Sequence, residues 1–165
     1  MKTCILPKFI SPVDNKLYRG RSISCPYRLY TLKQNGITQI VDLRNNFSVR
    51  KVMEKMFCKI LGIKYINQRY PHRLNNLPSK DFLKETCDII SKNEQNTYLQ
   101  CLKGKRRTGI VTAFYEKFYT KKSDEEILDN LCKKGFNEIN INTKKGKKYL
   151  NILTEFIDTY LPNLK

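Results

Sequence analysis

Residues 101–109 (CLKGKRRTG) bring a thiol, a guanidinium and a hydroxyl together at a spacing that suits phosphoryl transfer. Cys101 is a candidate nucleophile because a thiolate can attack phosphorus and form a covalent intermediate. Arg107 offers a planar fork that can hold two phosphoryl oxygens. Thr108 can donate its hydroxyl to the sulfur when the intermediate is hydrolysed. The stretch therefore predicts a phosphate-binding loop with Cys101, Arg107 and Thr108 as catalytic residues.

The rest of the stretch supplies surroundings for an anion. It lies between an expected strand and an expected helix, where backbone N–H groups can converge on a phosphate. Gly104 permits a tight turn, and the cationic side chains and the helix N-terminus should lower the pKa of Cys101. We expect phosphate to contact Leu102, Lys103, Gly104, Lys105, Arg106 and Arg107.

Strands and helices alternate around this loop. The predicted strands cover residues 17–19, 37–43, 63–66 and 97–100, with the first at the sheet edge before a turn at Gly20. The predicted helices cover residues 26–34, 48–61, 79–92, 108–120, 123–135 and 145–161. Val52, Met56 and Ile60 share one face of the second helix. The alternation predicts an α/β fold with a small, mostly parallel central sheet flanked by helices, in a single domain over residues 1–165.

The motif Cys-x5-Arg-Thr-Gly resembles the signature loop of the protein tyrosine and dual-specificity phosphatase superfamily. Its inner sequence is most similar to the atypical dual-specificity phosphatases of plants and fungi and their bacterial relatives. Residues 18–21 (YRGR) resemble the family's "YRSG" strand, residues 36–44 (GITQIVDLR) resemble its "GIKTIIDLR" strand, and Pro78 resembles the start of the segment before the catalytic strand. The resemblance covers about residues 17–136. It implies a cysteine-phosphatase fold and hydrolysis through a phosphocysteine, without a cofactor.

The chain departs from the family pattern at two places. The residue before the nucleophile is usually His and is Gln100 here. We therefore expect a Cys101 pKa above the family's usual value, though below the roughly 8.5 of a free cysteine. The loop that usually carries the aspartic general acid holds no carboxylate. Asp81, His72 or no side chain at all remain as alternatives for the acid.

Composition narrows the partners. A net charge of +17 and an isoelectric point of about 9.7 favour a polyanionic partner. An ordinary lysine-rich surface without such a partner would give the same net charge. The six cysteines have no metal-type spacing and the chain has one histidine, so we expect no metal. No apolar run is long enough for a membrane span. We expect a cytoplasmic monomer.

Substrate predictions remain open between two classes. The loop chemistry predicts hydrolysis of a phosphomonoester or phosphoanhydride, on a phosphoprotein or, as the resemblance implies, on an inositol polyphosphate or pyrophosphate. Lys103, Lys105 and Arg106 favour a substrate with more than one phosphate. Two alternatives stand beside this prediction. One is an RNA 5′-triphosphatase, although no nucleic-acid motif supports RNA binding. The other is a catalytically weak module that binds phosphorylated ligands.

Overall fold

The computed structural model describes residues 10–71, 76–120, 122–136 and 142–164. Its contacts divide the chain into two compact units. The sheet unit comprises residues 1–69 and 92–104, and the helical unit comprises residues 70–91 and 105–165. Each unit has buried apolar residues of its own. One domain over residues 1–165 stays a prediction.

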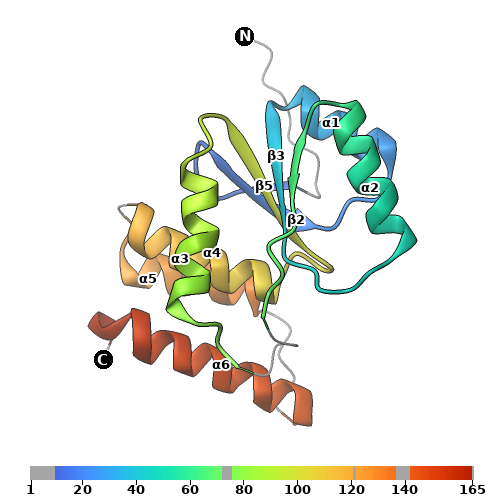
Figure 1. Ribbon diagram of the computed structural model, residues 1–165. Helices are drawn as coiled ribbons and strands as arrows, with labels where there is room; N and C mark the ends of the chain where they lie inside the picture. Colours follow the sequence, from blue (N-terminus) through green and yellow to red (C-terminus); the bar gives the residue numbers. More distant parts are fainter. Residues whose placement is uncertain (1–9, 72–75, 121, 137–141, 165) are drawn as a thin grey trace. The chain divides into compact units, whose positions relative to one another are not determined.

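The sheet unit is built on a five-stranded sheet in the order β1-β2-β5-β3-β4 (Figure 1). The strands are β1 (Ile10–Pro12), β2 (Leu17–Arg21), β3 (Ile37–Asp42), β4 (Lys64–Ile66) and β5 (Asn96–Cys101). Only β1 and β2 pair in antiparallel fashion, and every other neighbouring pair is parallel. The predicted α/β class and the mostly parallel sheet are confirmed.

The first predicted strand needs correction. It is not at the edge, because β1 pairs with it on one side and β5 on the other. It also does not end before Gly20, which pairs with Gln100 inside the ladder. β1 was not predicted, since a three-residue segment with a proline gives no alternation from which a strand can be read.

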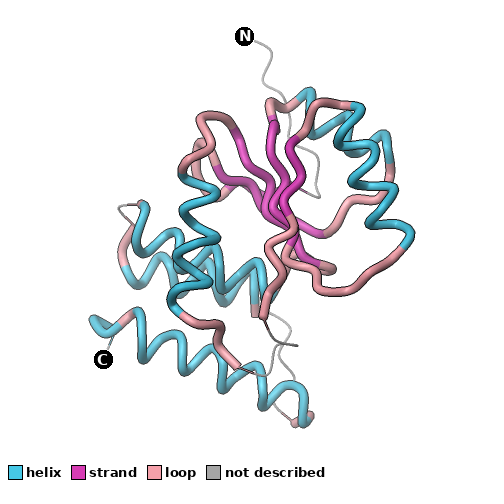
Figure 2. Tube along the Cα trace, in the orientation of Figure 1, coloured by secondary structure: helices cyan, strands magenta, loops and turns pink. Residues whose placement is uncertain are grey.

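Two helices cover one side of this sheet (Figure 2). They are α1 (Pro26–Gln34) and α2 (Val49–Ile60), and they contact each other. Proline begins α1, and the Ser48 hydroxyl caps α2 by accepting a hydrogen bond from the Lys51 N–H (3.3 Å). Their inward residues form a core with the sheet that includes Leu29, Leu32 and Cys58.

The helical unit contains α3 (Lys80–Ser91), α4 (Arg106–Tyr119), α5 (Asp124–Asn130) and α6 (Lys144–Tyr160). Its short elements are the π-helical segment η1 (Leu131–Gly135) and the 3-10 segment η2 (Pro162–Leu164). α4 contacts α3, α5 and α6, which explains why every residue from Thr108 to Glu116 is buried. The capping box of Ser123 and Glu126 begins α5 as predicted. The single helix predicted over residues 123–135 is α5 followed by η1. None of the described helices is long and apolar enough to cross a lipid bilayer.

Candidate active site

The stretch that carries the predicted chemistry runs from the last residue of β5 to the first turns of α4. Cys101 ends β5 and is 5 % exposed, and its carbonyl oxygen accepts a hydrogen bond from the Ser22 N–H (2.8 Å). α4 begins at Arg106. The predicted order of strand, loop and helix is confirmed. Residues 101–104 belong to the sheet unit and residues 105–108 to the helical unit.

Gly104 lies against the backbone of β2. Its φ is +67°, and a Cβ built on it would lie 2.3 Å from the carbonyl carbon of Gly20 and 2.4 Å from the nitrogen of Arg21. Arg19, buried in the same strand, donates from Nη2 to the Gly104 carbonyl oxygen (3.1 Å). The YRGR segment therefore holds the first half of the loop. That role for Arg19 and Gly20 was not predicted from the sequence.

Gln100 is fully buried and uses both ends of its amide. Its Nε2 donates to Glu54 Oε1, and its Oε1 accepts from the Ile23 N–H (3.2 Å). An amide placed between a carboxylate and an N–H has only one satisfactory orientation. The side chain before the nucleophile is therefore fixed in position by α2 and by the segment after β2.

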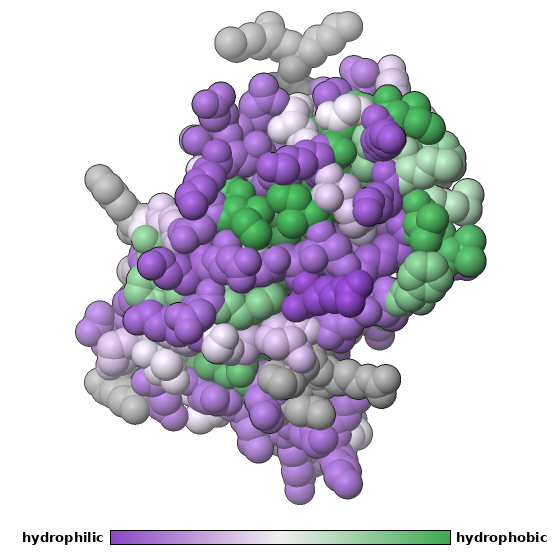
Figure 3. Space-filling view, viewed as in Figure 1, coloured by the Kyte–Doolittle hydropathy of each residue, from purple (hydrophilic) through white to green (hydrophobic). Residues whose placement is uncertain are grey.

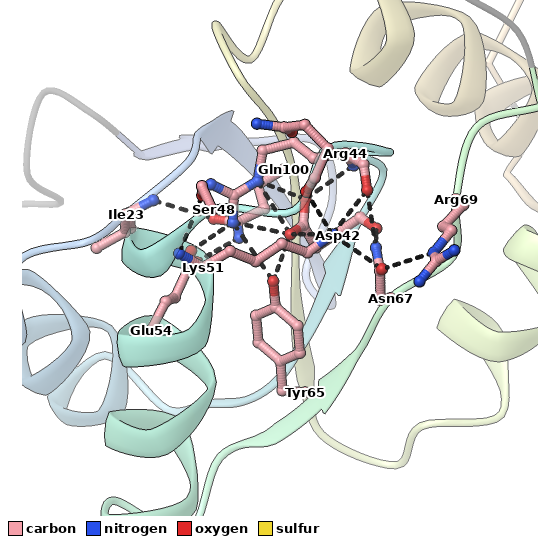
Figure 4. A network of polar contacts seen from close by, with 11 residues as sticks. Ile23, Asp42, Arg44, Ser48, Lys51, Glu54, Tyr65, Asn67, Arg69 and Gln100 are labelled. Atoms are coloured by element: carbon pink, nitrogen blue, oxygen red, sulfur yellow. Dashed lines mark hydrogen bonds and ion pairs between the residues drawn. The ribbon is translucent and has the colours of Figure 1, made fainter.

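Glu54 belongs to a buried network of charges at the carboxyl ends of β3 and β5 (Figure 4). Arg44 donates from Nε to Asp42 Oδ1 (2.9 Å) and from Nη2 to Glu54, while the Tyr65 hydroxyl donates to Asp42. Burial raises the pKa of Glu54, although hydrogen bonds from Gln100 and Arg44 oppose the rise. Burial would lower the pKa of Arg44, but Asp42 and Glu54 raise it instead.

Sequence reasoning found the DLR segment of this network through its resemblance and missed Glu54. The available signal was the position of Glu54 on α2, four residues before the buried Cys58 and so on the same inward face. A carboxylate at an inward position needs a buried cationic or hydrogen-bonding partner. Only the fold shows that these partners are Arg44 and Gln100.

In the helical unit, the side chains of the second half of the loop are largely enclosed. Thr108 Oγ1 and the Nε atoms of Arg106 and Arg107 are buried, with no hydrogen-bond partner among the described residues. The Arg106 guanidinium stacks on the ring of Tyr149, 3.6 Å from its centroid, and Arg107 lies 5.9 Å from the ring centroid of Tyr70. Phosphate binding by these residues stays a prediction.

Of the two candidate general acids, the structure describes only Asp81. Asp81 is exposed in the first turn of α3, where a carboxylate also suits the helix dipole. His72 lies outside the described residues. The identity of the acid stays open between Asp81, His72 and none. A site without metal also stays a prediction; among the described residues no group of three or more His, Cys, Asp or Glu could hold one.

Cys58, Cys87 and Cys132 have environments unlike that of a reactive thiol. The described cysteines are all free, and Cys58 and Cys87 are buried. Burial and nearby Glu54 raise the pKa of Cys58 to about 12, and burial raises that of Cys87. Burial also raises the pKa of Cys132.

A pocket of about 420 Å³ lies in the sheet unit, just beyond the carboxyl end of β3. It is lined by Asn45, Asn46, Phe47, Lys51, Val52, Lys55, Tyr65, Asn67 and Arg69. These nine residues include three cations and no carboxylate. β3 is the neighbour of the strand that ends at Cys101: Asp42 pairs with Gln100, and the Leu43 N–H donates to the Gln100 carbonyl oxygen (2.9 Å).

A family model described as "Polymorphic toxin system, DSP-PTPase phosphatase" matches residues 16–118, which is more than half of the chain. The chain therefore belongs to this family of dual-specificity-type phosphatases, which hydrolyse phosphoric monoesters. The resemblance to the tyrosine and dual-specificity phosphatase superfamily is confirmed.

Solved structures of phosphatases share the fold. The chain is similar to the core catalytic domain of the PP-IP phosphatase SIW14 from S. cerevisiae, with 19% identity, a TM-score of 0.73 and coverage of 94% of this chain and 87% of that one. It is also similar to PTPMT1 (16% identity, TM-score 0.64, coverage of 94% and 98%) and to P. aeruginosa TpbA (10% identity, TM-score 0.65, coverage of 94% and 91%). No curated protein matches the sequence.

Proposed function

We propose that the protein hydrolyses a polyphosphorylated small molecule, an inositol polyphosphate or pyrophosphate, through a phosphocysteine on Cys101. The observation that carries this choice of substrate is the basic pocket beyond the carboxyl end of β3, which pairs with the strand that ends at Cys101. A substrate with one phosphate needs a single anion site. A substrate with several phosphates benefits from a second cationic site at the same sheet edge.

In the proposed reaction, the Cys101 thiolate attacks phosphorus, and the bond between phosphorus and the leaving oxygen breaks. Arg107 and the loop N–H groups hold the non-bridging oxygens as their charge grows. A water molecule then attacks the phosphocysteine and releases inorganic phosphate, while Thr108 donates a hydrogen bond to the departing sulfur. The sulfur leaves as a thiolate and the water proton goes to solvent or to the acid-base group.

The leaving group also favours a phosphoanhydride. An alkoxide is a poor leaving group and needs a general acid, whereas a phosphate can leave without one. Asp81 is exposed on the first turn of α3, where the helix dipole stabilises a carboxylate whether or not it takes part in catalysis. A site without a dedicated acid would therefore cleave pyrophosphates faster than alkyl monophosphates.

Two exposed cations in the pocket can meet further phosphates. Lys51 is not one of them, because its ammonium donates to the Arg44 carbonyl oxygen (2.8 Å) and to Asn67 Oδ1 (2.9 Å). Lys55 and Arg69 are exposed, and Arg69 makes a long contact of 3.3 Å from Nε to Asn67 Oδ1. The Lys55 ammonium lies on α2 and the Arg69 guanidinium follows β4, so each can bind a separate phosphate of one ligand. The SIW14 structure, described as a PP-IP phosphatase, supports the same substrate class.

A phosphate-binding module with little turnover is the second candidate. It is favoured by Gln100, which precedes the nucleophile, carries no charge and donates to the buried Glu54 carboxylate. The phosphoprotein and the RNA 5′-triphosphate remain alternative substrates. We also propose that the protein acts in a reducing compartment such as the cytoplasm, since its described cysteines are free thiols.

Phosphate release from a panel tests the proposal. The panel compares an aryl phosphate, an inositol pyrophosphate, phosphopeptides and triphosphorylated RNA, each with wild type and Cys101→Ser. We expect the inositol pyrophosphate to give the highest kcat/KM. Turnover of phosphopeptides or RNA alone would contradict the substrate class and keep the phosphatase. No turnover of any compound, with tight binding of inositol pyrophosphate, would favour the binding module.

A further inference from the structure

The outward face of α2 is apolar. Glu54 and Cys58 face the core, and the opposite side carries five side chains that are 43–72 % exposed. These are Val49, Val52, Met53, Met56 and Ile60. Their spacing of 3, 4, 7 and 11 residues from Val49 places them in one stripe along the helix. Figure 3 shows hydrophobic residues gathered on the right of the view, where Figure 1 places α2.

Exposed aromatic side chains also occur on α1 and just before α2. Tyr27 and Tyr30 of α1 are 76 % and 51 % exposed, and α1 contacts α2 on the same side of the sheet. Phe47, just before α2, is 86 % exposed. Scattered apolar residues are ordinary on a protein surface, but a continuous stripe with aromatic neighbours marks an interaction site.

The charges around the stripe are of one sign. Outside the core, α1 and α2 carry the cations Arg28, Lys33, Arg50, Lys55 and Lys59, while the Lys51 ammonium is held by the Arg44 carbonyl oxygen and Asn67. Their only carboxylate is Glu54, which is fully buried and paired with Arg44. The helical positions of Arg50 and Lys59 lie on opposite flanks of the apolar stripe.

We propose that this outer face of α1 and α2 docks on an anionic lipid bilayer. An apolar stripe bordered by Lys and Arg is the pattern of a helix that lies in a membrane interface. The apolar side chains would enter the boundary between headgroups and acyl chains. Tyr27 and Tyr30 would lie at headgroup depth, and Lys and Arg would extend their stems along the stripe to reach lipid phosphates.

Two other occupants fit the charges less well. A second copy of this chain would bring an equal charge of +17 against the same surface, so the copies would repel each other. A protein partner would need to bury the lysines that border the stripe, and lysine is depleted at protein interfaces. The residues also project from a convex helix, which suits a flat, deformable surface. This inference does not rest on the proposed substrate, although Phe47, Val52 and Lys55 also line the pocket beyond β3.

Co-sedimentation with vesicles tests the proposal. We expect the protein to bind vesicles of phosphatidylcholine mixed with phosphatidylglycerol, to bind pure phosphatidylcholine weakly, and to be released by salt. Replacing Met56 and Ile60 together by Glu should reduce binding by about tenfold or more, because two charges would enter the interface. Leu150→Glu on α6 is the matched control, since Leu150 is also exposed (42 %), and it should leave binding unchanged.

A second pair of variants separates the local surface from the total charge. Arg50→Gln with Lys59→Gln should weaken binding by about tenfold or more. Lys145→Gln with Lys147→Gln on α6 removes the same charge and should have a much smaller effect. Thermal unfolding and aryl phosphate turnover of each variant establish that it is folded. If the double Glu variant unfolds, Met56→Gln with Ile60→Gln replaces it.

Three results would overturn the proposal. Absence of binding to phosphatidylglycerol vesicles would assign the stripe to a protein partner. Equal losses in the two charge-neutralised pairs would show that total charge, and not this face, causes the binding. Self-association in light scattering that the Met56 and Ile60 substitutions abolish would assign the stripe to a second copy.

Discussion

Replacing Gly104 by Ala changes two things at once in the loop after Cys101. The φ of +67° belongs to the left-handed region, which costs a residue with a Cβ about 1–2 kcal/mol. The new Cβ would also lie 2.3–2.5 Å from three backbone atoms of Gly20 and Arg21. Those atoms belong to a strand paired on both sides, so they cannot move aside easily.

The shift of the loop follows from these distances. Ordinary contacts to a Cβ begin near 3.4 Å, so the loop must move by about 1 Å away from β2. The movement also strains the Arg19 hydrogen bond to the Gly104 carbonyl oxygen. A displacement of about 1 Å at a catalytic centre lowers the rate by about 10²-fold. We therefore expect kcat on an aryl phosphate to fall by about that factor, with a loss of stability of about 2–3 kcal/mol.

Gly62→Ala is the matched control. Gly62 has nearly the same φ (+65°), but a Cβ there would approach only Lys33 Nζ, at 3.9 Å. It should lose about 1–2 kcal/mol of stability and keep its kcat. Denaturant unfolding and initial rates on both variants measure the two effects. If Gly104→Ala kept a kcat within about threefold of wild type, the close approach to β2 would not position the loop.

Four further results are expected. Cys101→Ser should lower turnover by about 10³-fold or more while keeping phosphate or vanadate binding. Arg107→Lys should be severely impaired because an ammonium cannot replace the planar fork of the guanidinium. If the serine variant kept a tenth of the wild-type activity, the assignment of Cys101 as nucleophile would be refuted. Iodoacetate should label Cys101 well before Cys58, whose pKa burial raises to about 12, and vanadate should protect it; mass spectrometry of the labelled peptides measures this. Burial raises the pKa of Glu54, so the folded state keeps its proton to a higher pH than the unfolded state does. The free energy of unfolding should therefore fall as pH rises above 4.5, the unfolded value. Urea unfolding at several pH values would measure this fall, which should be absent in Glu54→Gln. Gln100→His should shift thiol alkylation to lower pH, and superimposable curves of alkylation rate against pH would contradict that expectation.

Local signals in the sequence were sufficient for most of the helices. Pro26 and Ser48 mark the first turns of α1 and α2, and the capping box at Ser123 marks α5. Such signals act within a few residues of the chain, so they can be read without a fold. The confirmed order of strand, loop and helix at Cys101 came from signals of the same kind.

Pairings between distant residues could not be read in this way. Gly20 was expected to turn the chain, yet it continues β2 and pairs with Gln100, and its backbone lies against Gly104. The face of α2 that holds Met56 and Ile60 could be recognised as one stripe. Whether this stripe is buried or exposed depends on which side of the helix meets the sheet, and in the fold Glu54 and Cys58 face inward while Met56 and Ile60 are exposed.

The network around Glu54 explains how an amide can stand where the family has a histidine. A neutral imidazole has one donor and one acceptor, and the Gln100 amide supplies the same pair to Glu54 and to the Ile23 N–H. Gln100 can therefore fix the backbone before Cys101 without a proton that titrates near neutral pH. A histidine at this position would lie beside the Glu54 carboxylate, which would favour its charged form and place a cation on the residue before the nucleophile. With Gln at residue 100, the side chain keeps its positioning role and loses its electrostatic role. The cations of the loop must then stabilise the Cys101 thiolate without it.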